Sequence, residues 1–138
     1  MTSRLTAVII DCHHPRELAE FWCEVLNYRV VEASDDAVEI SPGELPDADL
    51  LAALRAGPFV PTIQFERVPE SKVFKNRVHL DVSPIDSTQD EEVLRLLRLG
   101  ASRADSEPGE ARPWVVMLDP EGNEFCVLRS LAPGVFSL

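Results

Sequence analysis

The stretch Trp114–Leu128, WVVMLDPEGNEFCVL, decides the fold of this chain. Two apolar runs flank the turn sequence DPEGN. Pro120 fixes φ near the value that the second residue of a turn requires, and Gly122 and Asn123 tolerate positive φ. The stretch therefore predicts a tight β-hairpin, with Cys126 on its return strand.

Length and composition predict one globular domain that spans residues 1–138. Of the 138 residues, 45% are hydrophobic and 27% are charged, which is typical of a folded protein large enough to bury a core. No apolar run approaches the roughly 20 residues that cross a membrane, and the first residues lack the pattern of a signal peptide. We therefore expect a cytoplasmic protein.

Charge and cysteine content restrict the partners. The net charge of −11 opposes binding to nucleic acid or to an anionic membrane, because both are polyanions. A small molecule is the expected partner. Cys12, Cys23 and Cys126 cannot all pair and match no zinc-binding spacing, so we expect reduced thiols.

The order of predicted elements occurs twice along the chain: one strand, one amphipathic helix and three further strands. In the first copy, His13 and His14 are expected as helix-entry residues, Pro15 lies in the first helical turn, and Asn27 can end the helix in a left-handed conformation. The helix has an apolar stripe at Leu18, Phe21, Trp22, Val25 and Leu26. The predicted strands are residues 8–11, 28–32, 36–40 and 59–68.

The second copy repeats this order. Ser87 and Asp90 are predicted to form a capping box, and Gly100 to end the helix. The apolar face of this helix consists of Val93, Leu96 and Leu97. The predicted strands are residues 77–82, 101–106, 113–118 and 124–129.

These elements predict an α+β fold of two tandem βαβββ modules. Module one covers about residues 4–68, module two covers about residues 74–130, and a tail follows at 131–138. One amphipathic helix can cover only one face of its sheet. We therefore expect the helices on the outer face and a curved mixed sheet around a cleft.

Alternation along the strands indicates which side chains face this cleft. In module two the cleft side consists of Arg77, His79 and Asp81. The helix side of the same strand consists of Val78, Leu80 and Val82. In module one the cleft side consists of Ala7, Ile9 and Asp11.

Three segments together resemble the vicinal oxygen chelate superfamily, and within it the glyoxalase-like domain proteins. They are LAEFW at 18–22, KNRVHLD at 75–81 and DPEGNEFC at 119–126. The superfamily includes glyoxalase I, extradiol dioxygenases, fosfomycin-resistance enzymes and bleomycin-binding proteins, so the resemblance implies a fold more than a function. Members commonly dimerise, which implies a homodimer.

In the metal-dependent members, His, Gln or Glu ligands lie at the start of the first strand and on the last strand of each module. The resemblance puts Ala7 and Arg77 at the two first-strand positions. Cys126 takes the last-strand position of module two, and Gln64 or Glu66 that of module one.

This ligand set cannot hold an ordinary divalent ion, because an alanine does not coordinate and a guanidinium repels a cation. We therefore predict no conventional metal site and no cofactor. A displaced site made of His79, Asp81 and Glu124 is the alternative.

The predicted ligand contacts are polar or aromatic side chains on the cleft side: Arg77, His79, Asp81, Gln64, Glu39, Trp114 and Cys126. Arg77 would bind an anion or carbonyl, His79 would act as acid or base, and Asp81 would orient it. A structural network across the sheet would explain these three residues equally well. Core packing is the alternative for Trp114 and Cys126.

Two functions follow from the resemblance and the missing metal set. The first is binding or sequestering of a small organic molecule. The second is a lyase or isomerase, either metal-free, with His79 as general base and Arg77 stabilising negative charge, or with displaced metal ligands. A structural dimerisation module is a third possibility.

Two segments fall outside the repeat. The insertion at 43–58 contains a predicted short helix at 49–55 that ends at Gly57, and it is either a lid or a surface and dimer contact. The tail at 131–138 is apolar enough to dock on the body or on a second subunit.

Overall fold

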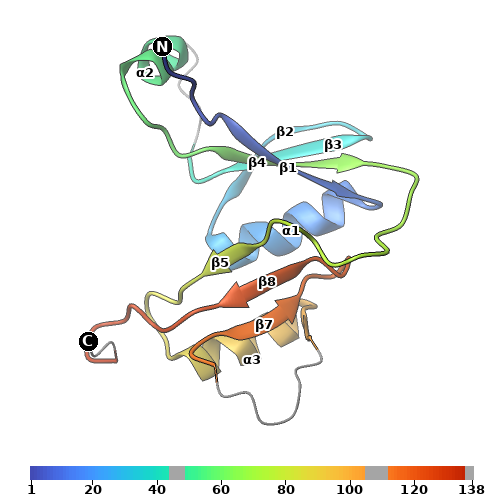
Figure 1. Cartoon of the computed structure of the whole chain (residues 1–138), viewed down its shortest axis with the longest axis vertical. Helices are drawn as coiled ribbons and strands as arrows, with labels where there is room; N and C mark the ends of the chain where they lie inside the picture. Colours follow the sequence, from blue (N-terminus) through green and yellow to red (C-terminus); the bar gives the residue numbers. More distant parts are fainter. Residues whose placement is uncertain (44–48, 105–111, 136–138) are drawn as a thin grey trace. The chain divides into compact units, whose positions relative to one another are not determined.

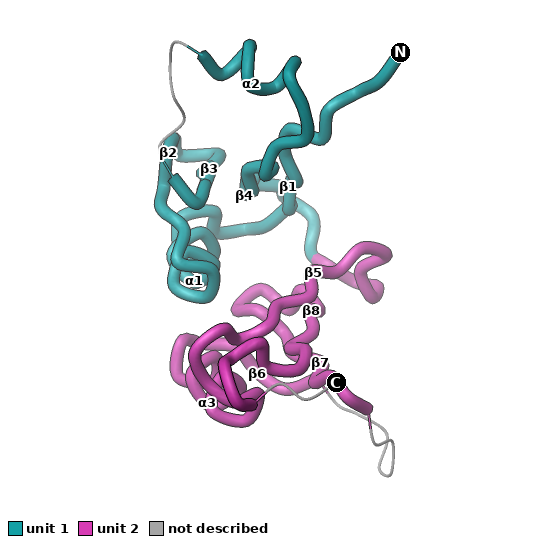
Figure 2. The backbone as a smooth tube through the Cα atoms, turned by 90° about the vertical axis from the view of Figure 1, so that its left-hand side faces the viewer, with its two compact units in different colours: residues 1–71 teal, residues 72–138 magenta. Residues whose placement is uncertain are grey.

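The computed structural model describes residues 1–43, 49–104 and 112–135. The chain forms two compact units, Met1–Ser71 (unit 1) and Lys72–Leu138 (unit 2), which Figure 2 shows in two colours. Each unit contains one four-stranded mixed sheet with the same strand order. The predicted α+β fold of two tandem βαβββ modules is confirmed, while the predicted cleft stays a prediction.

Unit 1 has the sheet order β1-β4-β3-β2, in which β1 runs parallel to β4 and the other pairs are antiparallel (Figure 1). Its elements are β1 (Ala7–Cys12), α1 (Pro15–Leu26), β2 (Arg29–Ala33), β3 (Ala37–Ser41), α2 (Leu50–Ala56) and β4 (Thr62–Arg67).

Unit 2 has the equivalent order β5-β8-β7-β6, again with one parallel pair, β5 with β8. Its elements are β5 (Leu80–Val82), α3 (Gln89–Leu99), β6 (Ser102–Arg103), β7 (Val115–Leu118) and β8 (Glu124–Val127). The repeated topology follows from the repeated sequence pattern, since each module has one helix to cover one sheet face.

Helix α1 has the predicted bounds and packs against β2, β3 and β4. Asn27 ends it at φ 55° and ψ 42°, and its backbone N–H donates to the carbonyl of Cys23. The buried core of unit 1 includes Leu18, Phe21, Trp22, Val38, Ile40 and Phe65. Each side chain of this size contributes about 1.5–3 kcal/mol when it is removed from water.

The two histidines before α1 are explained by their local contacts. His13 Nε2 lies 2.9 Å from the backbone carbonyl oxygen of Glu70, so the ring ties the entry of α1 to the chain that follows β4. The rings of His13 and His14 meet edge to face, with centroids 6.4 Å apart. These contacts support the prediction of helix-entry residues.

The capping box of α3 lies one residue later than predicted. Thr88 Oγ accepts a bond from the Glu91 N–H at 3.2 Å, and the Glu91 carboxylate accepts one from the Thr88 N–H at 2.8 Å. The bond from the Thr88 N–H, together with one from the Thr88 hydroxyl to the same carboxylate, lowers the pKa of Glu91. Ser87 instead accepts a bond from Ser130 at its carbonyl, and its own hydroxyl has no partner among the described residues. A glutamate at the third helical position reaches back to the cap, whereas Asp90 is one position too early.

Strand β5 is shorter than predicted, since Arg77 and Val78 form a bend. Val78 was expected beneath α3 but is 75% exposed. The strand register explains why β5 starts late. Leu80 pairs with Phe125 near the start of β8, so the residues before His79 lie beside the hairpin turn. The turn has no strand with which these residues could form a ladder. Strand β6 is also short, and residues 105–106 of its predicted range lie outside the described residues.

The hairpin β7–β8 is confirmed, with Gly122 at φ 84°. Asp119, which is 3% exposed, organises the turn. Its Oδ1 accepts bonds from the N–H groups of Glu121 (2.9 Å) and Asn123 (3.0 Å). Asn123 was expected to tolerate positive φ; instead its side-chain amide donates to the Asp119 carboxylate.

The insertion forms α2, none of whose residues is buried. Arg4 Nε donates to the carbonyl of Leu54 at 2.6 Å, which attaches α2 to the N-terminal segment. A shallow pocket there is lined by Thr2, Arg4, Leu51, Leu54 and Arg55. Whether α2 acts as a lid stays a prediction, and residues 136–138 of the tail lie outside the described residues. Across the described ranges, we find no helix of the length and hydropathy that a membrane span requires.

Candidate functional site

The strand register of unit 2 sorts its side chains onto two faces. Phe125, Val127 and Met117 share one face and are fully buried on the side of α3, which packs against β6 and β8. The opposite face, which we call the uncovered face of unit 2, carries side chains in register with Cys126. It consists of His79, Asp81, Val116, Leu118, Glu124 and Cys126.

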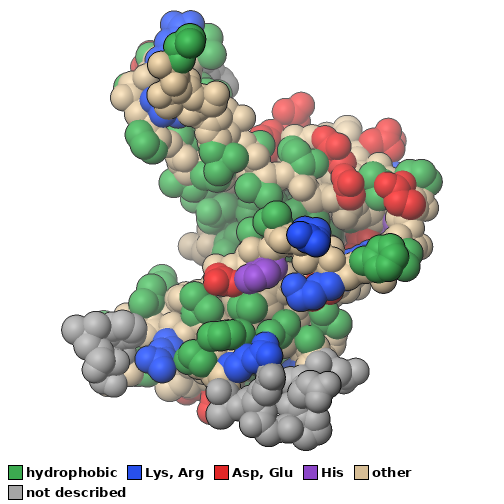
Figure 3. All heavy atoms as spheres, viewed as in Figure 1, with side chains coloured by type: hydrophobic (Ala, Val, Ile, Leu, Met, Phe, Trp, Pro, Cys, Tyr) green, Lys and Arg blue, Asp and Glu red, His purple; other side chains and the backbone are tan. Residues whose placement is uncertain are grey.

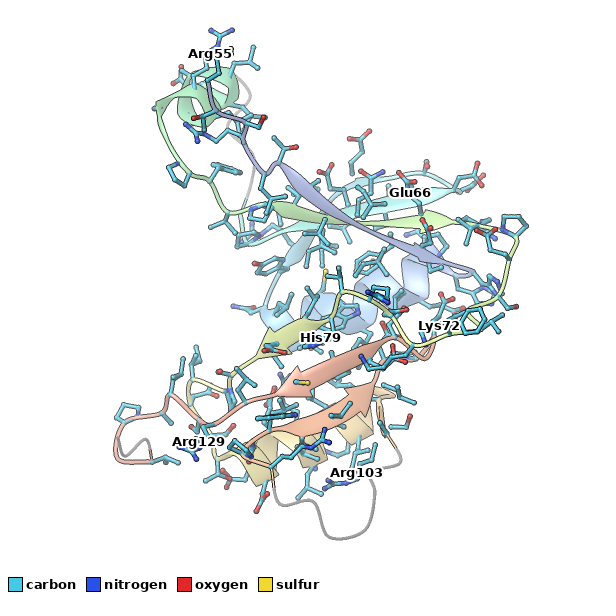
Figure 4. The ribbon with its side chains drawn as sticks, in the orientation of Figure 1. Arg55, Glu66, Lys72, His79, Arg103 and Arg129 are labelled. Carbon is cyan, nitrogen blue, oxygen red and sulfur yellow. The ribbon has the colours of Figure 1, made fainter. Side chains whose placement is uncertain are left out.

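Three residues that were predicted as ligand contacts meet on this face, and we call them the His79 cluster: His79, Asp81 and Cys126. His79 Nδ1 lies 3.1 Å from Asp81 Oδ1, and the Cys126 thiol is hydrogen-bonded to Asp81. The side chains of His79 and Asp81 are 42% and 46% exposed, whereas Cys126 is 8% exposed. Figure 4 shows His79 beside β5. The role of the cluster as a ligand site stays a prediction.

The carboxylate of Asp81 determines how the imidazole can act. An ionised carboxylate only accepts hydrogen bonds, so the proton of neutral His79 lies on Nδ1. Nε2 then carries the lone pair and can accept a proton or coordinate a metal ion. This arrangement can perform acid–base chemistry, and it can equally bind a donor group of a ligand.

Cys126 is a protonated thiol in this environment. Burial raises its pKa most, and the negative charge of Asp81 and its hydrogen bond with the thiol raise it further. The positive charges of Lys75 and Arg112 act in the opposite direction, but their effect is smaller. A thiol of this kind is a weak nucleophile at neutral pH. Cys126 therefore contributes a small polar contact at the floor of the face.

The hairpin positions the chain that enters β5. Lys72 Nζ bonds Glu124 Oε1 at 2.8 Å, and the Asn76 N–H donates to Glu124 Oε2 at 3.0 Å. The Asn76 side-chain amide donates to Asn123 at 2.9 Å. Residues 72–76 are thereby attached to the turn, three residues before His79.

Glu124 is committed to this attachment. Burial acts to raise its pKa, but the bonds from Lys72 and Asn76 and the charge of Lys72 outweigh it, so the pKa is lowered. The alternative metal site predicted from the sequence used Glu124 as a ligand together with His79 and Asp81. In the structure the Glu124 carboxylate instead forms an ion pair with Lys72. The sequence reasoning missed Lys72 and Asn76, although Asn76 lies within the segment KNRVHLD.

The remaining predicted contacts of unit 2 are exposed. Arg77 lies on the bend before β5. Trp114 immediately precedes β7, is 39% exposed, and has the guanidinium of Arg112 at 5.8 Å from its ring centroid. The alternative of core packing does not describe a tryptophan with this exposure.

Gln64 and Glu39 pair with each other in the β3–β4 ladder, on the sheet face opposite the buried side chains of Val38 and Phe65. Gln64 Nε2 donates to Glu66 Oε1 at 2.8 Å, and Thr62 donates to Glu39 Oε1 at 2.6 Å. Asp11 pairs with Glu66 in the β1–β4 ladder, so this face is acidic. Figure 4 marks Glu66 on it.

Among the described residues, the His79 cluster is the one group of three His, Cys, Asp or Glu side chains whose ligand atoms all lie within 4.8 Å of one another. Its imidazole, carboxylate and sulfur donors are chemically suited to Zn²⁺. The cluster contains Cys126 where the sequence-based alternative contained Glu124.

Comparison with known families gives one match across most of the chain. A family model described as a glyoxalase-like domain matches residues 7–128. The comparison with curated proteins found no significant match.

Solved structures resemble the chain over nearly its whole length. A glyoxalase/bleomycin resistance protein/dioxygenase family enzyme from Burkholderia phytofirmans PsJN is 19% identical, with a TM-score of 0.60, covering 91% of this chain and 97% of that one. The fosfomycin resistance protein FosX from Mesorhizobium loti is 15% identical, with a TM-score of 0.63, covering 93% and 92%.

A variant of FosX from Listeria monocytogenes, solved with Mn(II) and 1S,2S-dihydroxypropylphosphonic acid, is 14% identical, with a TM-score of 0.61, covering 94% of this chain and 92% of that one. At these identities the likeness concerns the fold alone.

Proposed function

Because the chain belongs to the glyoxalase-like domain family, we propose that it binds a small organic molecule on the uncovered face of unit 2, with the His79 cluster as its polar centre. The main support for this proposal is that the Asp81 carboxylate is hydrogen-bonded to both His79 and Cys126. Apolar Val116 and Leu118 lie on the same face. Small-molecule sites combine apolar surface with a few placed polar groups in this way.

The charges around the cluster favour an anionic or carbonyl-bearing ligand. Lys75 and Arg112 lie close enough to Cys126 to influence its pKa, and Arg77 is two residues from His79. In Figure 3 a histidine lies directly beside an acidic side chain, with Lys or Arg side chains and apolar side chains near both. The phosphonate in the FosX neighbour is a ligand of this charge class, so carboxylates and phosphonates are the first compounds to test.

A lyase or isomerase is the second candidate, favoured by the His79–Asp81 pair. With Nδ1–H donated to the carboxylate at 3.1 Å, Nε2 of His79 is the free base position. It would remove a proton from a carbon next to a carbonyl, and Arg77 would stabilise the negative charge that develops on the carbonyl oxygen. The same ring can return the proton to a different atom.

A thermal-shift screen tests the binding proposal, since a ligand that binds only the folded state raises the melting temperature. The panel contains carboxylates, phosphonates, aldehydes and thiol conjugates. We expect an anionic member to stabilise the wild type and His14→Ala but not His79→Ala or Arg77→Ala. His14→Ala is the matched control because it removes an imidazole from unit 1.

The proposal fails if every compound leaves the melting temperature unchanged, or if His79→Ala responds as the wild type does. Circular dichroism of each variant establishes that it is folded. The homodimer that the resemblance implies is a further proposal, and light scattering of the purified chain measures it.

A further inference from the structure

We infer that the insertion of unit 1 forms a second binding site, for a small alkyl carboxylate, between α2 and the N-terminal segment. The pocket there has a volume of about 300 Å³ and is lined by Thr2, Arg4, Leu51, Leu54 and Arg55. This volume is at the lower end of the range of about 300–1,000 Å³ that small-molecule sites occupy. The pocket shares no residue with the His79 cluster, so the inference goes beyond the proposed function.

Helix α2 brings both apolar and basic side chains to the pocket. Leu51, Leu54 and Arg55 are spaced i, i+3 and i+4, which places them on one face of the helix. None of the residues of α2 is buried, and Leu51 is 67% exposed. The apolar part of this face is therefore available to the alkyl chain of a ligand, which it would partly remove from water.

The second basic group comes from the N-terminal segment. Arg4 Nε donates to the carbonyl of Leu54 at 2.6 Å, in the last turn of α2, where helix carbonyls lack a partner within the helix. This bond positions the guanidinium at the pocket and leaves its Nη donors for a ligand. Within residues 1–43, 49–104 and 112–135, no carboxylate forms an ion pair with Arg4 or Arg55.

The pocket is a basic spot on an acidic unit. In Met1–Ser71, thirteen acidic residues stand against five arginines and no lysine, and two of those arginines line the pocket. Figure 4 labels Arg55 on α2, and Figure 3 shows Lys or Arg side chains beside hydrophobic ones in this part of the chain. An anion is therefore attracted to this spot and repelled by most of the remaining surface of unit 1.

The two kinds of side chain together select the ligand class. A guanidinium binds a carboxylate through two parallel hydrogen bonds, and Arg4 and Arg55 offer two such groups. The leucines favour an alkyl chain over a second polar group. A carboxylate without a chain, or a chain with a positive head group, would satisfy only half of the pocket.

The test is an NMR titration of the isotope-labelled full chain with octanoate as the probe. We expect saturable shifts at the backbone amides of residues 2–4 and 50–56, with a Kd below about 1 mM. Acetate lacks the alkyl chain and octylamine reverses the charge, so neither should produce saturable shifts at these amides.

Three variants examine the assigned contacts. Arg55→Gln and Leu51→Ser should each weaken octanoate binding at least about fivefold. Both side chains are exposed, so the substitutions should leave the fold intact. Arg16→Gln is the matched control, because it removes an exposed arginine from α1 of the same unit, and it should retain the wild-type Kd.

The inference is overturned if octanoate gives no saturable shift at these amides up to about 10 mM, tenfold above the expected Kd. It is also overturned if acetate binds as tightly as octanoate, or if Arg55→Gln or Leu51→Ser keeps the wild-type Kd. His79→Ala should retain the shifts at α2. Their loss in that variant would assign them to the uncovered face of unit 2 and overturn the site in unit 1.

Discussion

Asp81 lies opposite Cys126 in the β5–β8 ladder and forms a hydrogen bond with its thiol. The same carboxylate accepts a bond from His79 Nδ1 at 3.1 Å. This one carboxylate thus adds to the effect of burial, which raises the pKa of the thiol most, and it favours the imidazole proton on Nδ1. Substitution of Asp81 is therefore expected to change the chemistry of both neighbours.

Asp81→Asn should increase the reactivity of Cys126. Burial is the main cause of the raised thiol pKa, and the charge of Asp81 is the next. Removing that charge lowers the pKa and increases the thiolate fraction, tenfold for each pKa unit. We expect alkylation by iodoacetamide near pH 8 to be at least about threefold faster, measured by mass spectrometry of the Cys126 peptide.

Cys23 is the internal control for this experiment. Its pKa is raised by burial and by Glu24 and Glu20, none of which the substitution alters. An unchanged rate at Cys126, or an equal increase at Cys23, would contradict the assigned contact between Asp81 and the thiol.

Lys72→Met should destabilise the chain in a pH-dependent way. The pKa of Glu124 is lowered in the folded state relative to its ordinary value of 4.5. Its contribution to stability is therefore complete above that pH and is lost as the pH falls through the folded-state pKa. We expect a loss of about 1 kcal/mol in the free energy of unfolding at pH 7, which diminishes below about pH 4.5.

Urea denaturation at several pH values measures this difference. Lys75→Met is the matched control, because its ammonium lies 3.5 Å from the Asn76 carbonyl and is not among the groups that lower the pKa of Glu124. A Lys72→Met loss that stays constant from pH 7 to pH 3 would show that the Glu124 bond is not its cause.

Asp119→Ala should disrupt the hairpin and, through it, the ligand face. The carboxylate is buried and accepts bonds from two backbone N–H groups and the Asn123 amide. Its removal should cost about 2–3 kcal/mol, because those donors lose their partner. Asp119→Asn keeps one acceptor oxygen and should cost less.

Asn123 also binds Asn76, so Asp119→Ala should weaken any ligand that requires His79 even under conditions where the variant is fully folded. The measurements are chemical denaturation and ligand titration of the same samples. Wild-type affinity in a destabilised variant would limit Asp119 to a purely structural role.

Asn27 offers a test of the end of α1. At φ 55° this residue is left-handed, where a side chain with a Cβ is strained and glycine is not. Asn27→Ala should lower the free energy of unfolding by about 1 kcal/mol, whereas Asn27→Gly should be neutral or slightly stabilising. Equal effects of the two substitutions would contradict the conformational explanation.

Local patterns predicted the fold well, because helices, caps and tight turns are determined by residues close together in the chain. The stripe of α1, its end at Asn27 and the turn at Gly122 all follow from spacing and backbone preference. Each repeat has one amphipathic helix for its four strands, and such a helix can cover only one face of the sheet. The errors were small and local, such as the capping box at Thr88 in place of Ser87.

The site was predicted less completely, because it depends on pairing between strands that are distant in sequence. Alternation placed His79 and Asp81 on one face, but nothing local specifies that Cys126 lies opposite Asp81 or that Lys72 and Asn76 bind Glu124. These contacts determine which carboxylate remains available to the cluster.

The sequence by itself determined the two modules, their hairpin and the face on which His79 lies, since these follow from short-range periodicity and turn chemistry. Only the tertiary structure decided that the thiol of Cys126, and not the carboxylate of Glu124, joins His79 and Asp81. The physical reason is the register of the β5–β8 ladder, which places Asp81 directly opposite Cys126. Glu124 lies next to the hairpin turn, where its carboxylate accepts bonds from Lys72 and Asn76.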